Sequence, residues 1–402
     1  MQIEKKYNRI IDYLIMLILL SVSGFSVVRN IFAENTDSLI ITAIIFFIVF
    51  IFNDLKKNKS KTYVYGLFYS IFFILILIFQ AIIFNYFRIE TIFGLFTRLF
   101  IAFFAVSILR YRFMDVYVKS LYYISIISLI VYIGQLIGLL QLELYLYGIG
   151  GVREPENNLI RNAAVFWEPG AYGGYLVIAL IFNALFINKS VKNKENLIFI
   201  ISLLTTFSTT SYISIIVFIL FYVYSRKASK NTKITYTLFL VPLFIFIIKQ
   251  DFILDKILKQ YEVSLNYAES NTASWNSQRF ISTYSDFQSF YSNPLIGSGL
   301  ASKTKYANTD STISTNGWIS MLASFGVIGS YIYFLGTWKF FINFCNKYTT
   351  NKKIIYFIIC LLILIGSSEA YFYNPFFWSV SLFGYIININ DPSNINKSLE
   401  VT

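Results

Sequence analysis

Histidine is absent from this chain of 402 residues, and only two cysteines, Cys345 and Cys360, are present. Histidine is the commonest metal ligand in proteins and the usual side chain that titrates near neutral pH. Two cysteines in apolar stretches make neither a disulfide framework nor the spacing of a metal site. The sequence therefore predicts no metal and no cofactor, and it excludes a histidine general base.

Charge is also scarce: charged residues make up 13% of the chain, against 56% hydrophobic residues. No soluble domain of this size tolerates so apolar a composition on its surface, so we predict an all-α polytopic membrane protein with one membrane domain over residues 1–402. The net charge of +12 comes from short lysine clusters between apolar runs. Such clusters are typical of membrane orientation signals, so we expect membrane lipids and no nucleic acid as partners.

Apolar runs recur from end to end, and a span needs about 20 residues. The first run follows a basic start but lacks the small-residue cleavage pattern of a signal peptide, so we assign it as a span. We predict about twelve spans, at 10–28, 38–53, 63–84, 92–109, 116–140, 167–187, 197–208, 211–224, 234–249, 317–342, 354–367 and 376–389.

Basic residues gather in alternate connections between these runs. The clusters are Lys5, Lys6 and Arg9; Lys56, Lys57, Lys59 and Lys61; Arg110 and Arg112; Lys189, Lys192 and Lys194; Arg226, Lys227, Lys230 and Lys233; and Lys347, Lys352 and Lys353. The positive-inside rule makes these loops and both termini cytoplasmic. Two of the loops on the outer side stand out: 141–166, and the long loop 250–316 between the ninth and tenth spans.

Two of the predicted spans are too short to cross alone. The segment 196–224 runs between two basic clusters and is interrupted at Ser208-Thr209-Thr210-Ser211. We favour a pair of short helices whose polar break reaches the outer side, which is allowed where protein or water satisfies the backbone. One tilted helix with a serine-lined kink is the alternative.

The long outer loop carries two helical patterns. Apolar residues from Leu254 to Leu265 follow helical spacing opposite a charged face, which predicts an amphipathic helix on the membrane interface. Phe280, Tyr284, Phe287 and Tyr291 repeat at the same spacing. Asn293-Pro294 ends that second helix, and Gly297-Ser298-Gly299 predicts a tight turn after it.

The stretch from Arg161 to Tyr175 sets a cation and a carboxylate at the mouth of an apolar segment. An ionised group there loses hydration unless it is paired or faces water, so the stretch is our first candidate site. Glu168 precedes Pro169 at a predicted helix start, where the positive end of the helix favours its charge. Helix-start chemistry alone is the alternative role of Glu168.

Arginine dominates the outer cations, and its planar fork grips two phosphate oxygens at once. Arg161 and Arg279 each lie in an aromatic-rich segment beside a Gly/Pro turn, and we assign both a functional role. Arg29, Arg88 and Arg153 are interpreted as solvated loop residues. Arg98 lies within the fourth span, where snorkelling or a structural ion pair competes with a role in binding.

Other candidates are aromatic or acidic. Trp167, Tyr172 and Trp318 are candidates for a binding role or for anchoring the chain at the membrane interface. Asp310, in a Ser/Thr-rich loop, and Glu369, in a short aromatic turn, are weaker candidates for a catalytic carboxylate.

Several motifs together resemble a known family. They are Arg161-Asn-x-x-x-Phe-x-Glu168-Pro169; the Ser/Thr-broken helix pair; Asn293-Pro294-Leu-Ile-Gly297-Ser-Gly299-Leu; Thr315-Asn316-Gly-Trp; and Phe325-Gly-Val-Ile-Gly329. In this order they resemble the Wzy-type polysaccharide repeat-unit polymerases of the O-antigen ligase and polymerase superfamily. Relatives often carry a histidine before the asparagine, where this chain has Thr315.

The resemblance implies a glycosyltransferase of the C superfamily in a bacterial inner membrane, with its site facing the periplasm. The substrates it implies are undecaprenyl-diphosphate-linked glycans, the growing chain as donor and a repeat unit as acceptor. A flippase and a chain-length regulator are implied pathway partners. Our hypothesis assigns Arg161 and Arg279 to the diphosphate, and it makes Glu168 the general base or the group that orients it. Asn316, Trp167, Tyr172 and Arg98 complete the predicted binding residues.

Three alternatives stay open. A ligase that moves finished glycan to another acceptor shares the topology and motifs, and the missing histidine favours the polymerase. A lipid-linked glycan transporter predicts repeated halves, broken helices and ionisable residues along a path. A non-catalytic membrane scaffold predicts that the outer arginines are dispensable.

Overall fold

The computed structural model describes residues 2–28, 41–45, 47, 60–85, 89–141, 144, 148–153, 159–188, 190–225, 234, 238, 258, 278–300, 314–348 and 354–387. At some element ends, including Arg279, it describes only the backbone. Most of the predicted spans 38–53 and 234–249 and of the interfacial helix at 254–265 lies outside the described residues, as do Arg29, Arg88 and Asp310.

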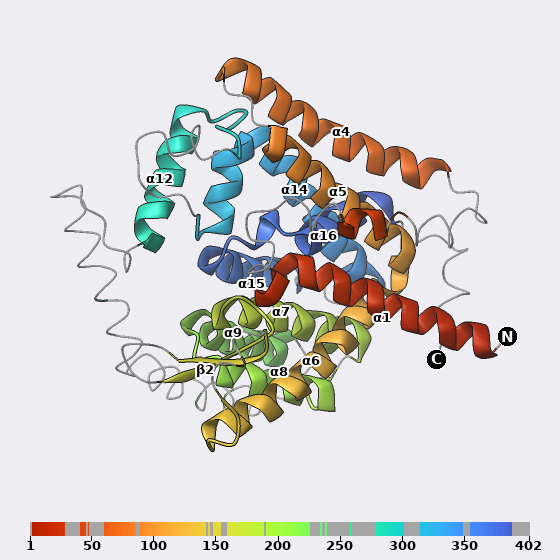
Figure 1. Ribbon diagram of the computed structural model, residues 1–402, viewed down its shortest axis with the longest axis vertical. Helices are drawn as coiled ribbons and strands as arrows, with labels where there is room; N and C mark the ends of the chain where they lie inside the picture. The colour runs from red at the N-terminus through yellow and green to blue at the C-terminus, as the bar shows by residue number, and fades with distance from the viewer. Residues whose placement is uncertain are drawn as a thin grey trace.

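The described chain is mostly helical, as Figure 1 shows. Its α-helices are α1 (Gln2–Gly24), α4 (Ser60–Ile83), α5 (Ile89–Leu109), α6 (Phe113–Leu136), α7 (Pro169–Ile181), α8 (Lys194–Thr205), α9 (Thr209–Ser225), α12 (Gln278–Ser292), α14 (Gly317–Tyr348), α15 (Ile354–Ser368) and α16 (Pro375–Ile386). A short 3-10 helix, Arg110–Arg112, joins α5 to α6, and a π-helical turn, Phe182–Ile187, extends α7.

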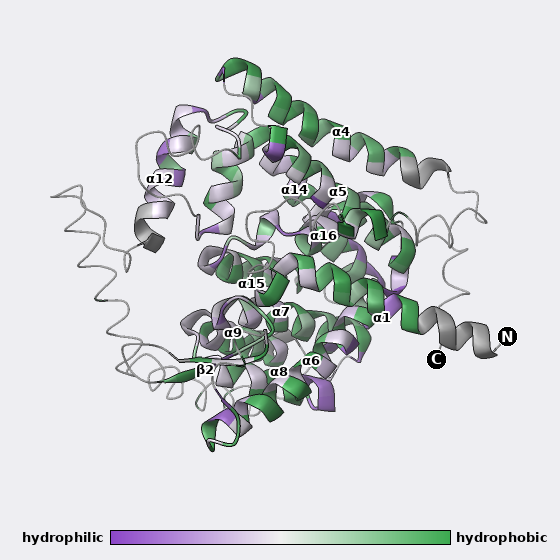
Figure 2. Cartoon of the chain, in the orientation of Figure 1, coloured by the Kyte–Doolittle hydropathy of each residue, from purple (hydrophilic) through white to green (hydrophobic). Residues whose placement is uncertain are grey.

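The prediction of a helical membrane protein is confirmed at this level. Four stretches are long and apolar enough to cross a bilayer: Val64–Ile83, Ile89–Leu136, Pro169–Ile187 and Gly317–Tyr348. Shorter apolar helices, Ile10–Gly24, Thr209–Val223, Ile354–Ser368 and Pro375–Ile386, accompany them. Hydrophobic residues cover α4 along most of its length, and much of that surface is exposed (Figure 2). The count of twelve spans stays a prediction.

The helices α5 to α9 and α14 to α16 run alternately in opposite directions, so the bundle has two ends. At one end, which we call the Glu168 end, α1 finishes, α7 begins, and the Ser23 side chain accepts from the Phe376 N–H (2.9 Å) at the start of α16. At the other end, the Val191 N–H donates to the hydroxyl of Tyr222 (3.1 Å), and the rings of Phe186 and Tyr348 lie 6.4 Å apart. Five basic residues of the predicted clusters, Arg110, Arg112, Lys192, Lys194 and Lys347, lie at this opposite end.

A two-stranded antiparallel sheet departs from the all-α prediction. Strands β1 (Gly150–Arg153) and β2 (Ile160–Ala164) pair within the outer loop 141–166. Asn162 Oδ1 accepts from Ser128 Oγ of α6 (2.7 Å), and Gln135 of α6 accepts from the Gly151 N–H (2.7 Å). These tertiary contacts hold strands that are too short to show a clear alternating pattern.

The prediction of two short helices in 196–224 is confirmed. Helix α8 ends at Thr205, α9 begins at Thr209, and Phe207 between them has a positive φ of 45°. The Tyr212 hydroxyl donates to the carbonyl of Leu204 (2.9 Å), which holds the two helices together across the break. The break therefore lies at the Glu168 end of the bundle.

The second helix of the long loop and its turn are also confirmed. Helix α12 ends at Ser292, and Gly297 and Gly299 adopt positive φ angles of 75° and 88°. The segment after α12 inserts at a break in α14, where Gly326 has φ 62°. The Val327 N–H donates to the carbonyl of Pro294 (2.8 Å), and the Ser298 N–H donates to that of Ala323 (2.7 Å). The inserted segment thus satisfies backbone groups that the broken helix leaves open.

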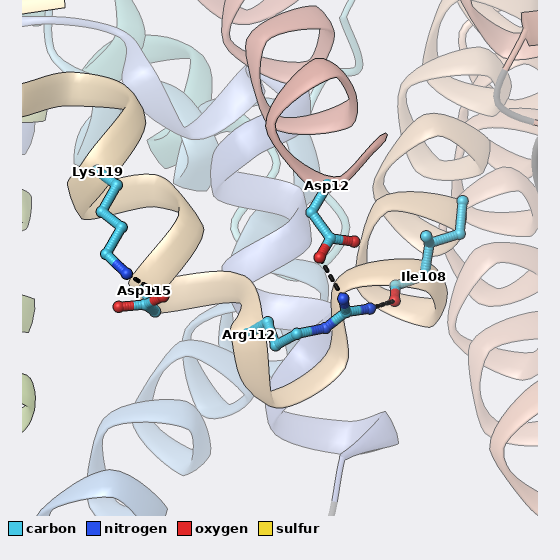
Figure 3. Close-up of polar contacts among 5 residues, drawn as sticks. All are labelled: Asp12, Ile108, Arg112, Asp115 and Lys119. Carbon is cyan, nitrogen blue, oxygen red and sulfur yellow. Dashed lines mark hydrogen bonds and ion pairs between the residues drawn. The ribbon is translucent and has the colours of Figure 1, made fainter. Parts of the chain in front are cut away.

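A buried carboxylate fixes α1 against the turn between α5 and α6. Asp12 of α1 is buried, and Arg112 donates to its carboxylate and to the carbonyl of Ile108 (3.3 Å) (Figure 3). Asp115 and Lys119 form a second ion pair nearby (3.1 Å), with both side chains nearly half exposed. Burial makes the first pair the stronger determinant of packing.

Arg112→Ala is expected to lower the free energy of unfolding by about 1–3 kcal/mol, because it leaves a buried carboxylate without its charged donor. Lys119→Ala is the matched control, and its expected cost is below about 1 kcal/mol. The thermal unfolding midpoint of the purified protein in detergent measures both changes. Equal midpoints for the two variants would contradict this ranking.

Candidate functional site

Glu168 occupies the N-cap of α7 in an extended conformation (φ −158°, ψ 159°). Its carbonyl accepts the first helical hydrogen bond, from the Tyr172 N–H (3.1 Å). Its carboxylate makes no capping bond to the helix backbone, and Pro169 follows at the first helical position. The usual side-chain N-cap bond therefore does not account for Glu168 at this position.

A second carboxylate meets Glu168 over Gly170. A Cβ atom built on Gly170 would lie 3.0 Å from Glu168 Oε1 and 3.7 Å from Glu369 Oε1. Glu369 is buried in the turn between α15 and the 3-10 helix η5 (Tyr371–Tyr373). Two carboxylates that are 201 positions apart in the chain thus share one small space, which a side chain at position 170 would enter.

The break between α8 and α9 forms a third side of this space. The Ser208 hydroxyl lies 3.7 Å from the same Cβ position on Gly170. Arg161 of β2 is half-buried, and its Nε donates to the carbonyl of Thr206 (3.2 Å) in the break. The hairpin, the break and the start of α7 therefore bring a guanidinium, a hydroxyl and two carboxylates to one end of the bundle.

Tyr371 fixes the Glu369 turn onto α7. Its hydroxyl is fully buried and donates to the carbonyls of Gly170 (2.8 Å) and Ala171 (3.2 Å). The Tyr371 N–H donates to the carbonyl of Glu369 (2.9 Å). Gly174 is needed beside it, since a Cβ there would lie 2.2 Å from the Tyr371 hydroxyl. Tyr371 therefore positions Glu369 relative to Glu168.

Tyr371→Phe is expected to cost about 0.5–1.5 kcal/mol of unfolding free energy and also to impair the activity of the site, since Glu369 loses its tether to α7. Tyr385→Phe is the matched control: that hydroxyl donates to the carbonyl of Ile332 (2.7 Å) in the second half of α14, away from the carboxylates. Unfolding midpoints measure the loss of stability, and gels of the polysaccharide that the motif resemblance implies measure the loss of activity. A control variant that loses as much activity as Tyr371→Phe would show that the effect is only structural.

The predicted aromatic residues lie in different surroundings. Trp167 is half-buried, with its ring centroid 6.2 Å from that of Tyr371 and its edge against Gly24. Tyr172 is fully buried, and its hydroxyl donates to Ser125 Oγ (2.9 Å) inside the bundle. Trp318 stacks on Phe334 (4.2 Å) and donates its indole N–H to the carbonyl of Leu362 (3.2 Å). Of these three, Trp167 is the closest in sequence to a candidate carboxylate, because it directly precedes Glu168.

Asn316 caps α14, since its Oδ1 accepts from the N–H groups of Trp318 (3.1 Å) and Ile319 (3.2 Å). The helix start that it caps adjoins the site: a Cβ on Gly317 would lie 2.8 Å from the Glu369 carbonyl. This capping explains the Asn-Gly-Trp pattern in structural terms.

The two remaining predicted arginines, Arg98 and Arg279, lie on helices α5 and α12. Arg98 of α5 is half-buried and lies near Tyr373, four positions after Glu369. Arg279 lies in the first turn of α12, one turn before Ser282, whose hydroxyl is 2.8 Å from that of Thr315. Thr315 directly precedes Asn316, so the backbone of α12 starts near the same end of α14.

Glu369, which the sequence ranks below Glu168 as a candidate, is the residue that the structure places beside it. In the sequence, Glu369 appears only as a lone carboxylate within the aromatic turn from Glu369 to Trp378. Such an aromatic turn is equally typical of the aromatic belt at a membrane interface. The proximity of Glu369 to Glu168 depends on the packing of α15 and η5 against α7, which no local pattern encodes.

No protein-family model matches this chain, and comparison with curated proteins and with solved structures gives no significant match either.

Proposed function

We propose that this protein is a membrane glycosyltransferase that polymerises undecaprenyl-diphosphate-linked repeat units into a surface polysaccharide such as O-antigen or capsule. The observation that carries the proposal is the convergence of Glu168 and Glu369 over Gly170, beside Arg161 and the polar break at Ser208. Proton transfer from a sugar hydroxyl needs a carboxylate at hand, and a departing diphosphate needs cations. The motif resemblance described above supports the same activity.

Charge distribution supports the proposed orientation. Arg110, Arg112, Lys192, Lys194 and Lys347, from the basic clusters of the sequence, lie at the end of the bundle opposite the carboxylates. With the positive-inside rule, this favours cytoplasmic basic loops and termini, about twelve spans, and a site that opens to the periplasm of a bacterial inner membrane. The lipid-linked glycan donor and acceptor meet the enzyme on that face in our proposal.

The proposed reaction is a single displacement at the anomeric carbon of the donor. A hydroxyl oxygen of the acceptor sugar forms the new glycosidic bond as the bond to the lipid diphosphate breaks. Glu168 takes the hydroxyl proton and releases it to water, while Glu369 accepts a hydrogen bond from the acceptor and orients it. Arg161 and Arg279 stabilise the negative charge that develops on the departing undecaprenyl diphosphate. Gly170 leaves room for the acceptor between the carboxylates.

Arg161→Ala and Arg279→Ala are each expected to reduce polymer formation by about 10²–10³-fold, since each removes charge stabilisation from the leaving group. Gels of surface polysaccharide from cells with normal levels of the variant proteins measure polymer length. Lys192→Ala, at the opposite end of the bundle, is the control. Wild-type ladders from both arginine variants would exclude them from the reaction.

Deletion of the gene tests the proposed function against its alternatives. A polymerase deletion leaves surface glycan one repeat unit long. A ligase deletion leaves long polymer on undecaprenyl diphosphate, and a transporter deletion leaves lipid-linked units on the cytoplasmic face. Gels of surface glycan and mass spectra of lipid-linked intermediates distinguish these three outcomes, and only the first agrees with our proposal.

Two features bear on the transporter alternative. Helix α14 is broken at Gly326 within an apolar stretch, and Arg98 lies in another, two features typical of transporters. The segment Pro294–Gly299 fills the break, however, and Gln80 of α4 donates to the carbonyls of Ile296 (2.5 Å) and Ser324 (2.7 Å) there. Because protein groups fill the break in α14, we favour a structural role for this break over a role in transport.

A further inference from the structure

Helix α12 packs with its polar face inward. The side chains of Ser282 and Asp286 are 0% exposed, and Ser285 (4%) and Ser289 (8%) are buried beside them. On the opposite side, Tyr284 is 57% exposed, Phe287 53% and Tyr291 80%. This is the reverse of a helix at the surface of a soluble protein, whose apolar face meets the core.

Hydrogen bonds fix this orientation. The hydroxyl of Ser282 lies 2.8 Å from that of Thr315, and the Ser314 hydroxyl donates to the Asp286 carboxylate. Ser298 Oγ in the turn after α12 donates to the carbonyl of Ser289 (3.1 Å). Rolling α12 to bury its aromatic residues would break these buried polar contacts, which is costly. The outward aromatic face is therefore built into the fold.

The aromatic face continues an exposed apolar surface that includes part of the candidate span α4. Leu295 (65% exposed) follows α12, and its carbonyl accepts from the Ile328 N–H (3.2 Å) of α14, where Val327, Ile328 and Tyr331 are exposed. Gln80 joins the carbonyl of Ile296 to α4, whose exposed side chains include Phe79, Ile82 and Ile83. Figure 1 shows α12 and α14 at the same end of α4. One apolar surface thus extends from the span α4 onto α12.

We propose that the Tyr284–Phe287–Tyr291 face of α12 lies in the bilayer interface, in contact with lipid. Two of its three aromatic residues are tyrosines, whose amphipathic rings suit the headgroup level. A helix that binds lipid on one side and the bundle on the other holds the start of α12 at a fixed membrane depth. The inference is independent of the proposed function, because it rests only on burial and polar contacts.

Spin labels at exposed positions of α12 test this contact. Phe287→Cys and Tyr291→Cys are made in a background with Cys345→Ala and Cys360→Ala, labelled with a nitroxide and reconstituted in phospholipid vesicles. Phe79→Cys on α4 serves as the lipid-facing reference, and Lys192→Cys, exposed in a connection, as the water-facing reference. Accessibility to oxygen, which concentrates in lipid, is compared with accessibility to a water-soluble nickel chelate.

At both α12 positions, the ratio of oxygen to nickel accessibility is expected to be several-fold above that at Lys192 and to approach that at Phe79. A ratio equal to that at Lys192 would place the face in water and overturn the proposal. Protection from both reagents would overturn it too, since a second copy or another protein would then cover the face. Because two positions are labelled in separate variants, the test can still be read if one variant fails to fold.

Discussion

Glu168→Gln is expected to reduce polymer formation by about 10²–10⁴-fold, the usual contribution of a general base. Glutamine keeps the size and the hydrogen-bonding capacity of the side chain but does not accept the proton of the acceptor hydroxyl. Glu168 makes no side-chain cap on α7, so the substitution leaves the helix start intact. The measurement is polymer length on gels, with variant protein quantified in the same membranes.

Glu369→Gln tests whether the two carboxylates have different roles. Because glutamine still orients the acceptor in our account, we expect a smaller loss from Glu369→Gln than from Glu168→Gln. Glu90→Gln, an exposed carboxylate in the first turn of α5, is the control and is expected to leave the ladder unchanged. A larger loss at Glu369 than at Glu168 would exchange the roles of the two residues.

Gly170→Ala is expected to reduce polymer formation by about 10–100-fold without removing any charge, because small displacements of reacting groups are costly. The new methyl group would lie 3.0 Å from Glu168 Oε1 and would enter the space between the carboxylates. Alanine is a better helix former than glycine by up to about 1 kcal/mol, so stability is expected to hold or rise.

Gly94→Ala is the matched control for this substitution. Gly94 also lies in an apolar helix, α5, but a Cβ there meets no atom within 4 Å. We expect it to leave both polymer length and the unfolding midpoint close to wild type or slightly improved. An activity loss in Gly170→Ala that is matched by Gly94→Ala, or accompanied by a lower midpoint, would contradict the steric explanation.

The sequence predicts the parts of this fold that depend on local patterns. Apolar runs of span length locate α4, α5, α6, α7 and α14, because burying backbone in lipid requires helices of that length. The polar interruption after Thr205 and the Asn293-Pro294 stop locate the ends of α8 and α12, since these residues disfavour continued helix. The sequence misses the hairpin, whose short strands depend on side chains of α6.

Which face of a helix is buried is harder to predict in a membrane protein. The aromatic periodicity of α12 locates the helix but not its orientation, because lipid and protein core are equally apolar. Hydroxyl contacts to Ser314 and Thr315 decide the outcome instead. The pairing of Glu168 with Glu369 is likewise tertiary, because a single buried tyrosine, Tyr371, ties their segments together.

The most direct test of the central claim is polymerisation by the purified full-length protein. The protein is reconstituted in liposomes with lipid-linked repeat units extracted from the deletion strain, and the products are separated on gels. Our account predicts a ladder that grows by whole repeat units with wild-type protein and only single units with Glu168→Gln. Folded wild-type protein that leaves the repeat units unchanged, or an undiminished ladder with Glu168→Gln, would contradict it.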